Sequence, residues 1–321
     1  MLRSDPTTRV SRWLPLVAFL AVVGAVPAVS PNAYALNVLG FIGINVLLAT
    51  GLNLLMGYAG QVSLGHAGFW GLGAYISGVL TARFGWPPLP AAALAVSGTC
   101  LVAFGVGLPT LRLKGHYLAM ATLGTGVILQ VLFVQCASLT GGPSGLVDVP
   151  NFSVGPFEVR TPLQNYYLIW SCVAIGLVGA LNLSMSRIGR ALNAIKGSEV
   201  AAECAGVPTH EYKVAVFVLS AAYAAVAGTL YVHFINFVAP EPFGFMGSVL
   251  LLTMVVVGGI GTFWGPVIGG SLMTVLPEYL RAYEGLEVLL YGLILVLVMM
   301  FVPQGFASLF RWLPRRAIRG A

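Results

Sequence analysis

Long runs of apolar residues that contain no charged side chain dominate the sequence. Residues 13–82 include no Asp, Glu, Lys or Arg. Further charge-free runs lie at 84–111, 115–147, 161–186, 214–240, 242–277 and 288–310. A membrane-spanning helix needs about 20 consecutive apolar residues. By that length the first run holds three helices, the run 242–277 holds one long helix or two short ones, and each other run holds one.

Basic residues at the two ends of the chain decide between nine and ten spans. They are Arg3, Arg9 and Arg12 before the first run and Arg311, Arg315, Arg316 and Arg319 after the last. Cytoplasmic flanks carry an excess of Lys and Arg, so we expect both termini in the cytoplasm, which requires an even number of spans. The ten predicted spans are residues 13–30, 34–56, 66–82, 88–108, 116–138, 164–184, 213–236, 247–262, 265–280 and 287–303.

The composition supports the same class of protein. Hydrophobic residues make up 58% of the 321 positions and charged residues only 8%, and the mean hydropathy is +0.91. A soluble domain carries roughly 25% charged residues. We therefore expect an all-α polytopic membrane protein that forms one transmembrane domain over residues 1–321. Residues 1–30 also resemble a cleaved signal peptide, but we favour a retained first span.

Missing motifs narrow the range of functions. The lysines Lys114, Lys196 and Lys213 follow no glycine-rich phosphate loop, so the chain shows no ATP-binding motif of that kind. No metal-binding spacing is present, and we predict no catalytic residue, metal or cofactor. The predicted span cores also lack the Asp, Glu or Arg that a proton-coupled carrier or a membrane enzyme uses. A pore that is driven by another subunit fits this pattern best.

Two glycine-rich stretches interrupt the apolar pattern, at residues 50–78 and 253–273. Such a density of small residues indicates either tight helix packing or broken helices whose backbone is buried in protein or lines a cavity. Pro266 favours a broken or re-entrant element in the second stretch. Under the second interpretation, uncharged polar side chains line a substrate path, and the candidates are Asn53, Gln61, Ser63, His66 and Gln130.

Two connections are long enough to have a role of their own. The segment 139–163 is rich in glycine and proline and is expected to form an outer loop with short extended pieces. In the segment 185–212, Ile188, Leu192 and Ile195 recur at helical spacing. A second short helix should begin at Ser198–Glu199 and end before Gly206. Two surface helices between spans indicate a docking element, although an ordinary solvated loop is the alternative.

Several blocks resemble a known family when they are taken in order. They are GYAGQVSLGHAGFWGLGAY (57–75), RLKGHYLAMATLG (112–124), TGGPSGL (140–146), GRALNAIKGSEVAAECAGV (189–207) and GGIGTFWGPVIGG (258–270). Together they are similar to permease subunits of branched-chain amino-acid ABC importers. The family usually carries charged residues where this chain has Gly197 and Ser198.

The resemblance implies a function and a set of partners. The chain would pair with a second, homologous permease in a heterodimer in the bacterial inner membrane. Two ABC ATPase subunits would dock on the cytoplasmic segment 185–212, and a periplasmic or lipid-anchored binding protein would deliver the amino acid. The ATPase-coupling residues it implies are Arg187, Gly189, Arg190, Glu199, Ala201, Ala202 and Gly206. An importer for urea, short amides or other small carboxylates, or a stand-alone channel, remains an alternative.

We expect Arg190 and Glu199 to act as polar anchors for the ATPase. Exposed charge pairs contribute only about 0–1 kcal/mol each. The docking should therefore also use the apolar face that Ile188, Leu192 and Ile195 form.

Overall fold

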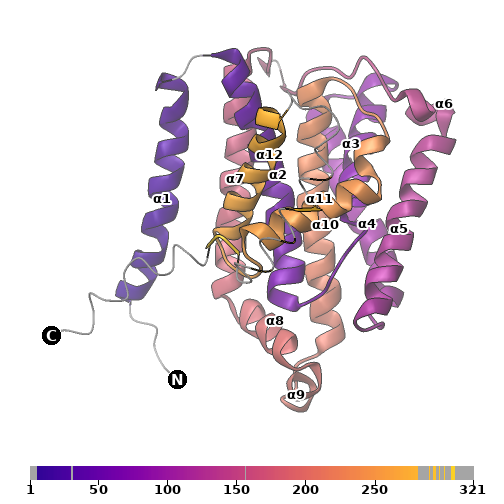
Figure 1. Cartoon of the computed structure of the whole chain (residues 1–321). Helices are drawn as coiled ribbons and strands as arrows, with labels where there is room; N and C mark the ends of the chain where they lie inside the picture. The colour runs from indigo at the N-terminus through magenta and orange to yellow at the C-terminus, as the bar shows by residue number, and fades with distance from the viewer. Residues whose placement is uncertain are drawn as a thin grey trace.

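The computed structural model describes residues 6–29, 32–155 and 157–280, and the single positions 289, 292, 293, 296, 300 and 305–307. Most of these residues are helical (Figure 1). The α-helices are α1 (Pro6–Val29), α2 (Ala33–Asn53), α3 (His66–Ala82), α4 (Pro88–Thr110), α5 (His116–Gln135), α6 (Ala137–Thr140), α7 (Pro162–Met185), α8 (Arg187–Gly197), α9 (Glu199–Cys204), α10 (Thr209–Ile235), α11 (Phe245–Gly258) and α12 (Gly265–Leu280). Strands β1 (Ser153–Val154) and β2 (Phe157–Glu158) pair antiparallel.

The predicted spans correspond closely to helices. Nine of the ten predicted segments fall on α1, α2, α3, α4, α5, α7, α10, α11 and α12. Five helical segments of the described chain are long and apolar enough to cross a membrane, namely Ala33–Tyr58, Pro88–Thr110, His116–Gln135, Pro162–Met185 and Thr209–Ile235. This arrangement is that of a multi-pass membrane protein.

Part of the predicted topology falls on residues that are not described. The predicted span 287–303 lies outside the described residues except for five single positions, and Arg3 and the C-terminal arginines lie outside them entirely. Ten crossings and two cytoplasmic termini therefore remain predictions.

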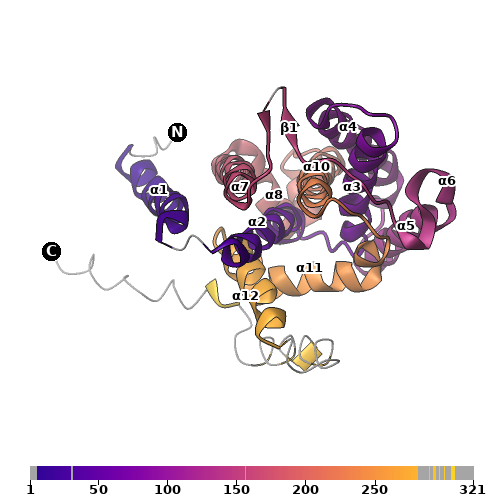
Figure 2. The ribbon, with the colours of Figure 1, turned by 90° about the horizontal axis from the view of Figure 1, so that it is seen from above.

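The predicted span 247–262 differs from the helix that is found. α11 has 14 residues, which at 1.5 Å per residue gives about 21 Å, whereas the hydrocarbon core is about 30 Å thick. Viewed from above, α11 lies lengthwise across the bundle while α2, α7 and α10 are seen end-on (Figure 2). Gly259, with φ 120°, ends α11, and α12 starts at Gly265. The predicted break between the two segments is thus found, and α11 is a short element, as expected of one of two short helices in the run 242–277.

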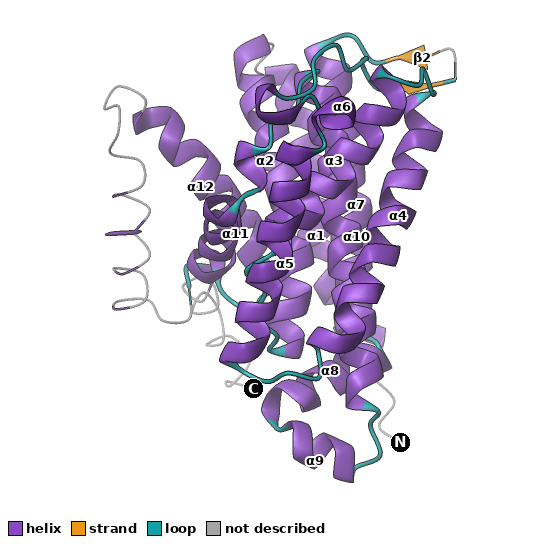
Figure 3. Ribbon diagram, turned by 90° about the vertical axis from the view of Figure 1, so that its right-hand side faces the viewer, coloured by secondary structure: helices purple, strands orange, loops and turns teal. Residues whose placement is uncertain are grey.

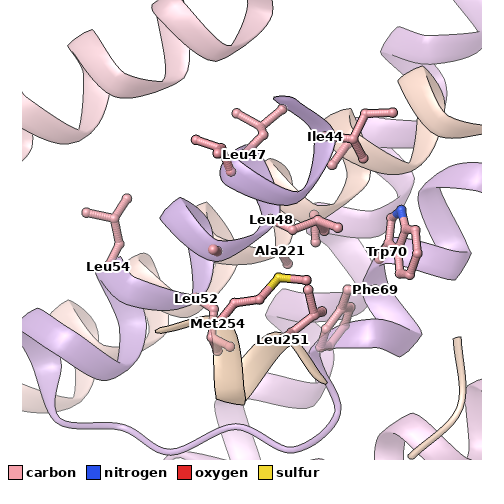
Figure 4. Packing of buried hydrophobic residues seen from close by; sticks show 14 of the residues in the cluster. Ile44, Leu47, Leu48, Leu52, Leu54, Phe69, Trp70, Ala221, Leu251 and Met254 are labelled. Carbon is pink, nitrogen blue, oxygen red and sulfur yellow. The ribbon is translucent and has the colours of Figure 1, made fainter. Parts of the chain in front are cut away.

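The first glycine-rich stretch is also broken as predicted. α2 ends at Asn53 and continues as a π-helical turn, Leu54–Tyr58, and the chain is then non-helical until α3 begins at His66. Helices α2, α3 and α10 surround the core, where Leu48, Phe69, Ala221 and Met254 are at most 1% exposed (Figure 4). The π-helical turn of the break lies against α10 and α8.

The outer loop, residues 139–163, is folded onto the ends of α3 and α10. Leu146 forms a β-bridge with Val238. The ring of His233 contacts Ser77 Oγ at 2.9 Å and the Pro150 carbonyl oxygen at 2.8 Å. The predicted short extended pieces are found as β1 and β2 (Figure 3). These contacts order the loop at the end of the bundle opposite α8 and α9.

The contact between α3 and α10 depends on glycine. A Cβ at Gly228 would fall on the carbonyl oxygen of Trp70 and the backbone of Ala74, neither of which is free to move aside. We expect Gly228→Ala to lower the free energy of unfolding by about 1–3 kcal/mol, as overpacking does. Thermal unfolding of the purified protein in detergent measures this change.

A matched control is Gly105→Ala in α4, where a Cβ would meet no atom within 4 Å. That variant should be as stable as the wild type or more stable, since alanine is the better helix former. Equal stability of the two variants would contradict the packing argument.

Candidate coupling segment and translocation path

Helices α8 and α9 form a protruding unit at one end of the bundle, which we call the coupling hairpin (residues 187–204; Figure 3). Both predicted surface helices are present. Ser186 caps α8 by accepting a hydrogen bond from the Gly189 amide, at 3.2 Å. Ser198 caps α9 by accepting from the Ala201 amide, at 3.3 Å. Gly206 follows α9 with φ 78°, a conformation that glycine adopts without strain. Local capping chemistry therefore accounts for the bounds of both helices.

The apolar face of α8 is used inside the protein. Leu192 is fully buried and Ile195 is 4% exposed, whereas Ile188 is 44% exposed. The prediction that Ile188, Leu192 and Ile195 form a docking face is therefore wrong for Leu192 and Ile195, which are buried. On α9 the exposed apolar side chain is Val200, at 64%. Ile188 and Val200 are thus the large apolar side chains that the coupling hairpin presents to a partner.

The other predicted coupling residues differ in accessibility. Arg187, Arg190, Ala201 and Gly206 are exposed, as a contact surface requires. Ala202 is 3% exposed, and Gly189 is buried where a Cβ would overlap the carbonyl oxygens of Leu183 and Ser184. Ala202 and Gly189 therefore hold the coupling hairpin to its own chain, and they offer no side chain to a partner.

Glu199 is engaged by two lysines of its own chain. It accepts a hydrogen bond from Lys213 of α10, and Lys114, in the α4–α5 connection, lies 3.6 Å from its other oxygen. Burial alone would raise the pKa of Glu199, but the hydrogen bond and the positive charges of Lys213 and Lys114 outweigh it, so the pKa is lowered. Lys213 itself is only 3% exposed. Glu199 thus links α9 to α10 and to the α4–α5 connection.

Lys196 makes a contact that the sequence did not reveal. Its Nζ donates to the Gly57 carbonyl oxygen, in the π-helical turn, at 2.7 Å. In the sequence it was only one of several basic residues of segment 185–212. The two residues are 139 positions apart, and no local pattern links them. This bond connects the coupling hairpin directly to the break in α2.

The predicted path residues do not gather at one place. Asn53 is buried where the break in α2 meets the α11–α12 connection; it accepts from the Gly261 amide at 2.8 Å and donates to the Thr262 carbonyl at 2.9 Å. Ser63 and His66 are buried at the start of α3, and neither Ser63 Oγ nor His66 Nε2 has a hydrogen-bond partner among the described residues.

The remaining two candidates are half-buried. The side-chain amide of Gln61 donates a hydrogen bond to the carbonyl oxygen of Ala59, two residues earlier in the chain, at 3.2 Å. Gln130 of α5 lies against Gly244, where a Cβ would meet its side-chain amide. The hydrogen bonds of Asn53 therefore serve the structure of the helix break. Contact between the substrate and any of the five candidate residues remains a prediction.

Comparison with known proteins gives a consistent set of relatives. The family model described as "Branched-chain amino acid transport system / permease component" matches residues 34–303. The high-affinity branched-chain amino acid transport system permease protein LivM of Escherichia coli is 31% identical over 269 residues, which cover 76% of this chain and 63% of LivM. No solved structure matches.

Two further relatives carry similar descriptions. The permease protein LivH of Salmonella typhimurium is 30% identical over 198 residues, 58% of this chain and 62% of LivH. The permease protein BraD of Pseudomonas aeruginosa is 28% identical over 251 residues, 72% of this chain and 80% of BraD. The chain thus spans less than two thirds of the length of LivM and LivH.

The ion pair of Glu199 with buried Lys213 gives a test of this geometry. Breaking a buried pair from one side costs about 3–5 kcal/mol, because the other charge is left unpaired. For Glu199→Gln we expect the lower end of that range, since Glu199 is 20% exposed. The double variant Glu199→Gln/Lys213→Met should recover most of the loss, and Glu211→Gln, an exposed carboxylate of α10, should cost little. Thermal unfolding measures all three, and no recovery in the double variant would contradict the pairing.

The same pair sets the sign of a pH dependence. Because the pKa of Glu199 is lowered in the folded protein, its contribution is complete above pH 4.5, the ordinary glutamate value. It is lost as the pH falls through the lowered pKa. The stability difference between wild type and Glu199→Gln should therefore be constant near neutrality and should shrink only in acid.

Proposed function

This chain belongs to the family of permease components of branched-chain amino acid transport systems, and we propose that it is a membrane-spanning subunit of an ATP-driven importer of branched-chain amino acids. The match of the family model over residues 34–303 supports the membership. The names of LivM, LivH and BraD support the class of substrate. The proposed location is the bacterial inner membrane.

One structural observation carries the coupling role. The coupling hairpin presents Ile188 and Val200 at its surface, and it is tied to the interior by Lys196 and Glu199. Covering these two apolar side chains with a partner would remove apolar surface from water, which favours association. An element that is accessible on one side and bonded to a helix break on the other is suited to carry a partner's movement into the bundle.

The proposed assembly has four kinds of component. A second, homologous permease subunit pairs with this chain, which agrees with its similarity to both LivM and LivH. Two ABC ATPase subunits bind the coupling hairpins from the cytoplasm. A periplasmic or lipid-anchored binding protein delivers the amino acid at the opposite end, where the outer loop is ordered by Leu146 and His233.

The proposed mechanism starts at the ATPase. Closure of the ATPase pair on ATP moves the coupling hairpin, and Lys196 transmits this movement to Gly57. Gly57 lies so close to Gly261 that a Cβ on either residue would meet the backbone of the other. The movement therefore reaches α2 and the α11–α12 connection together, and these two elements change their relative position between outward-open and inward-open states.

The docking role is tested by reconstituting the chain with a binding protein, a second permease and the ATPases of the same transport system. We expect ATP-dependent uptake of labelled leucine into proteoliposomes. Val200→Asp places a charge in the proposed apolar contact and should reduce both co-purification of the ATPases and uptake at least tenfold. The matched control is Val147→Asp, an equally exposed valine (59%) of the outer loop, which should retain the ATPases. Uptake without ATP, or equal retention by both variants, would contradict the proposal.

The transmission role is tested at Lys196. A hydrogen bond from a charged donor contributes about 1.5–3 kcal/mol, and about 1.4 kcal/mol corresponds to a factor of ten. We expect Lys196→Met to keep the ATPases bound but to lower leucine uptake per ATP hydrolysed at least tenfold. Lys196→Arg, which keeps a donor, should restore part of the coupling. A Lys196→Met complex with wild-type coupling would rule out this route.

A further inference from the structure

A groove lies between α2, α11 and α12, on a face that the sequence analysis did not single out. It encloses about 440 Å³, within the range of small-molecule sites. Its polar lining comprises Tyr34, Asn37, Asn45, Thr274 and Glu278. None of the predicted path residues borders it. The groove therefore offers a second, independent set of uncharged and charged polar groups within the apolar bundle.

The polar side chains lie on helices that are otherwise strongly apolar. Asn45 donates to Thr274 Oγ1 at 2.8 Å, and the Tyr34 hydroxyl donates to Glu278. Asn37 is exposed. A polar side chain on a spanning helix is costly against lipid and faces the bundle interior or a water-filled space. This face of α2 and α12 is thus unsuited to lipid.

Apolar side chains form the rest of the groove. Phe41 of α2, Met254 of α11 and Met273 of α12 line it, and both methionines are at most 1% exposed overall. Methionine adapts to apolar groups of different shape. The groove therefore combines a polar side and an adaptable apolar side, as a small amphiphilic molecule requires.

The groove is lined mainly by the first half of α2 and the second half of α12. α2 begins and α12 ends near the end of the bundle that the outer loop shares (Figure 1), with Tyr34 in the first turn of α2 and Glu278 in the last turn of α12. Deeper in the bundle the two helices meet closely, because a Cβ at Gly270 would contact the backbone of Val46. Beyond that point Asn53 bonds to Gly261 and Thr262. A molecule that enters from the outer end is therefore stopped before the coupling end.

We propose that this groove is the subsite of the permease that receives the transported amino acid, an inference that rests on the proposed function. The carboxylate of Glu278 faces the ammonium group of the zwitterion. The side-chain amides of Asn37 and Asn45, each of which carries two N–H donors, face its carboxylate. Val38 and Phe41, the half-buried apolar residues of the lining, contact the branched aliphatic side chain. No basic side chain is present among the described residues that line the groove, so uncharged donors bind the carboxylate of the amino acid and hold it weakly.

Thiol labelling tests whether the groove contains water in the assembled complex. In a background in which Cys100, Cys136, Cys172 and Cys204 are replaced by serine, Asn45→Cys should react with a water-soluble methanethiosulfonate reagent. The matched control Leu101→Cys, on an α4 position that is 72% exposed but apolar, should not react. L-leucine delivered by its binding protein should slow the labelling at Asn45→Cys at least threefold.

Uptake kinetics test whether the groove recognises the amino acid. Asn45→Leu and Glu278→Gln should each raise the half-saturating leucine concentration at least fivefold, with the complex still assembled as judged by co-purification. Asn165→Leu makes the same polar-to-apolar change at a half-buried position of α7, away from the groove, and should leave it unchanged.

The outcomes separate the two proposals. A wild-type complex without ATP-dependent uptake would refute the proposed function, whereas labelling at Asn45→Cys depends only on the groove. If Asn45→Cys reacts in the isolated chain but not in the complex, the groove is a contact with the second permease and the subsite is refuted. The same holds if labelling is insensitive to leucine and both groove variants take up leucine normally.

Discussion

Helix breaks inside a membrane must be satisfied by protein, because no water is present there to bond the freed backbone groups. In this chain the break after α2 and the break between α11 and α12 supply hydrogen-bond partners to one another. The amide of Asn53, at the end of regular α2, accepts from the Gly261 amide and donates to the Thr262 carbonyl of the α11–α12 connection. The glycines Gly57 and Gly261 allow the two backbones to approach closely enough for this. The junction of these two breaks is the constraint on which the rest of the arrangement depends.

The proposed coupling contact lies at that junction, and the proposed groove lies on the same elements. Lys196 of the coupling hairpin bonds to Gly57, within the junction. The groove runs along the same pair of elements, α2 and α11–α12, toward the opposite end. The contact of α3 with α10 differs, because Gly73 and Gly228 there lie against backbone with no space for a methyl group. A force applied to the coupling hairpin therefore reaches the polar, hydrogen-bonded junction through Lys196 and the close-packed helix α10 through Glu199.

Local patterns predicted much of this structure. The charge-free runs predicted the positions of nine helices, and the density of glycine predicted both helix breaks. Ser198 and Gly206 predicted where α9 begins and ends. The orientation of α8 could not be predicted: Leu192 and Ile195 face inward and Ile188 outward, and helical spacing says only that they share a face. The bonds of Lys196 and Glu199 join segments distant in the sequence, for which no local signal exists.

The placement of the path illustrates how polar residues in apolar sequence should be interpreted. Polar side chains were sought where glycine and polar residues are dense, but a break is where the backbone itself needs bonding partners, and Asn53 is used for that purpose. An unbroken helix satisfies its own backbone. A polar side chain such as Asn37 or Asn45, in the regular part of α2, therefore has no backbone break beside it to satisfy. Such a side chain forms hydrogen bonds with another helix, with water or with a substrate. Asn37, which is exposed and lines the groove, is therefore a stronger indication of a substrate path than Asn53.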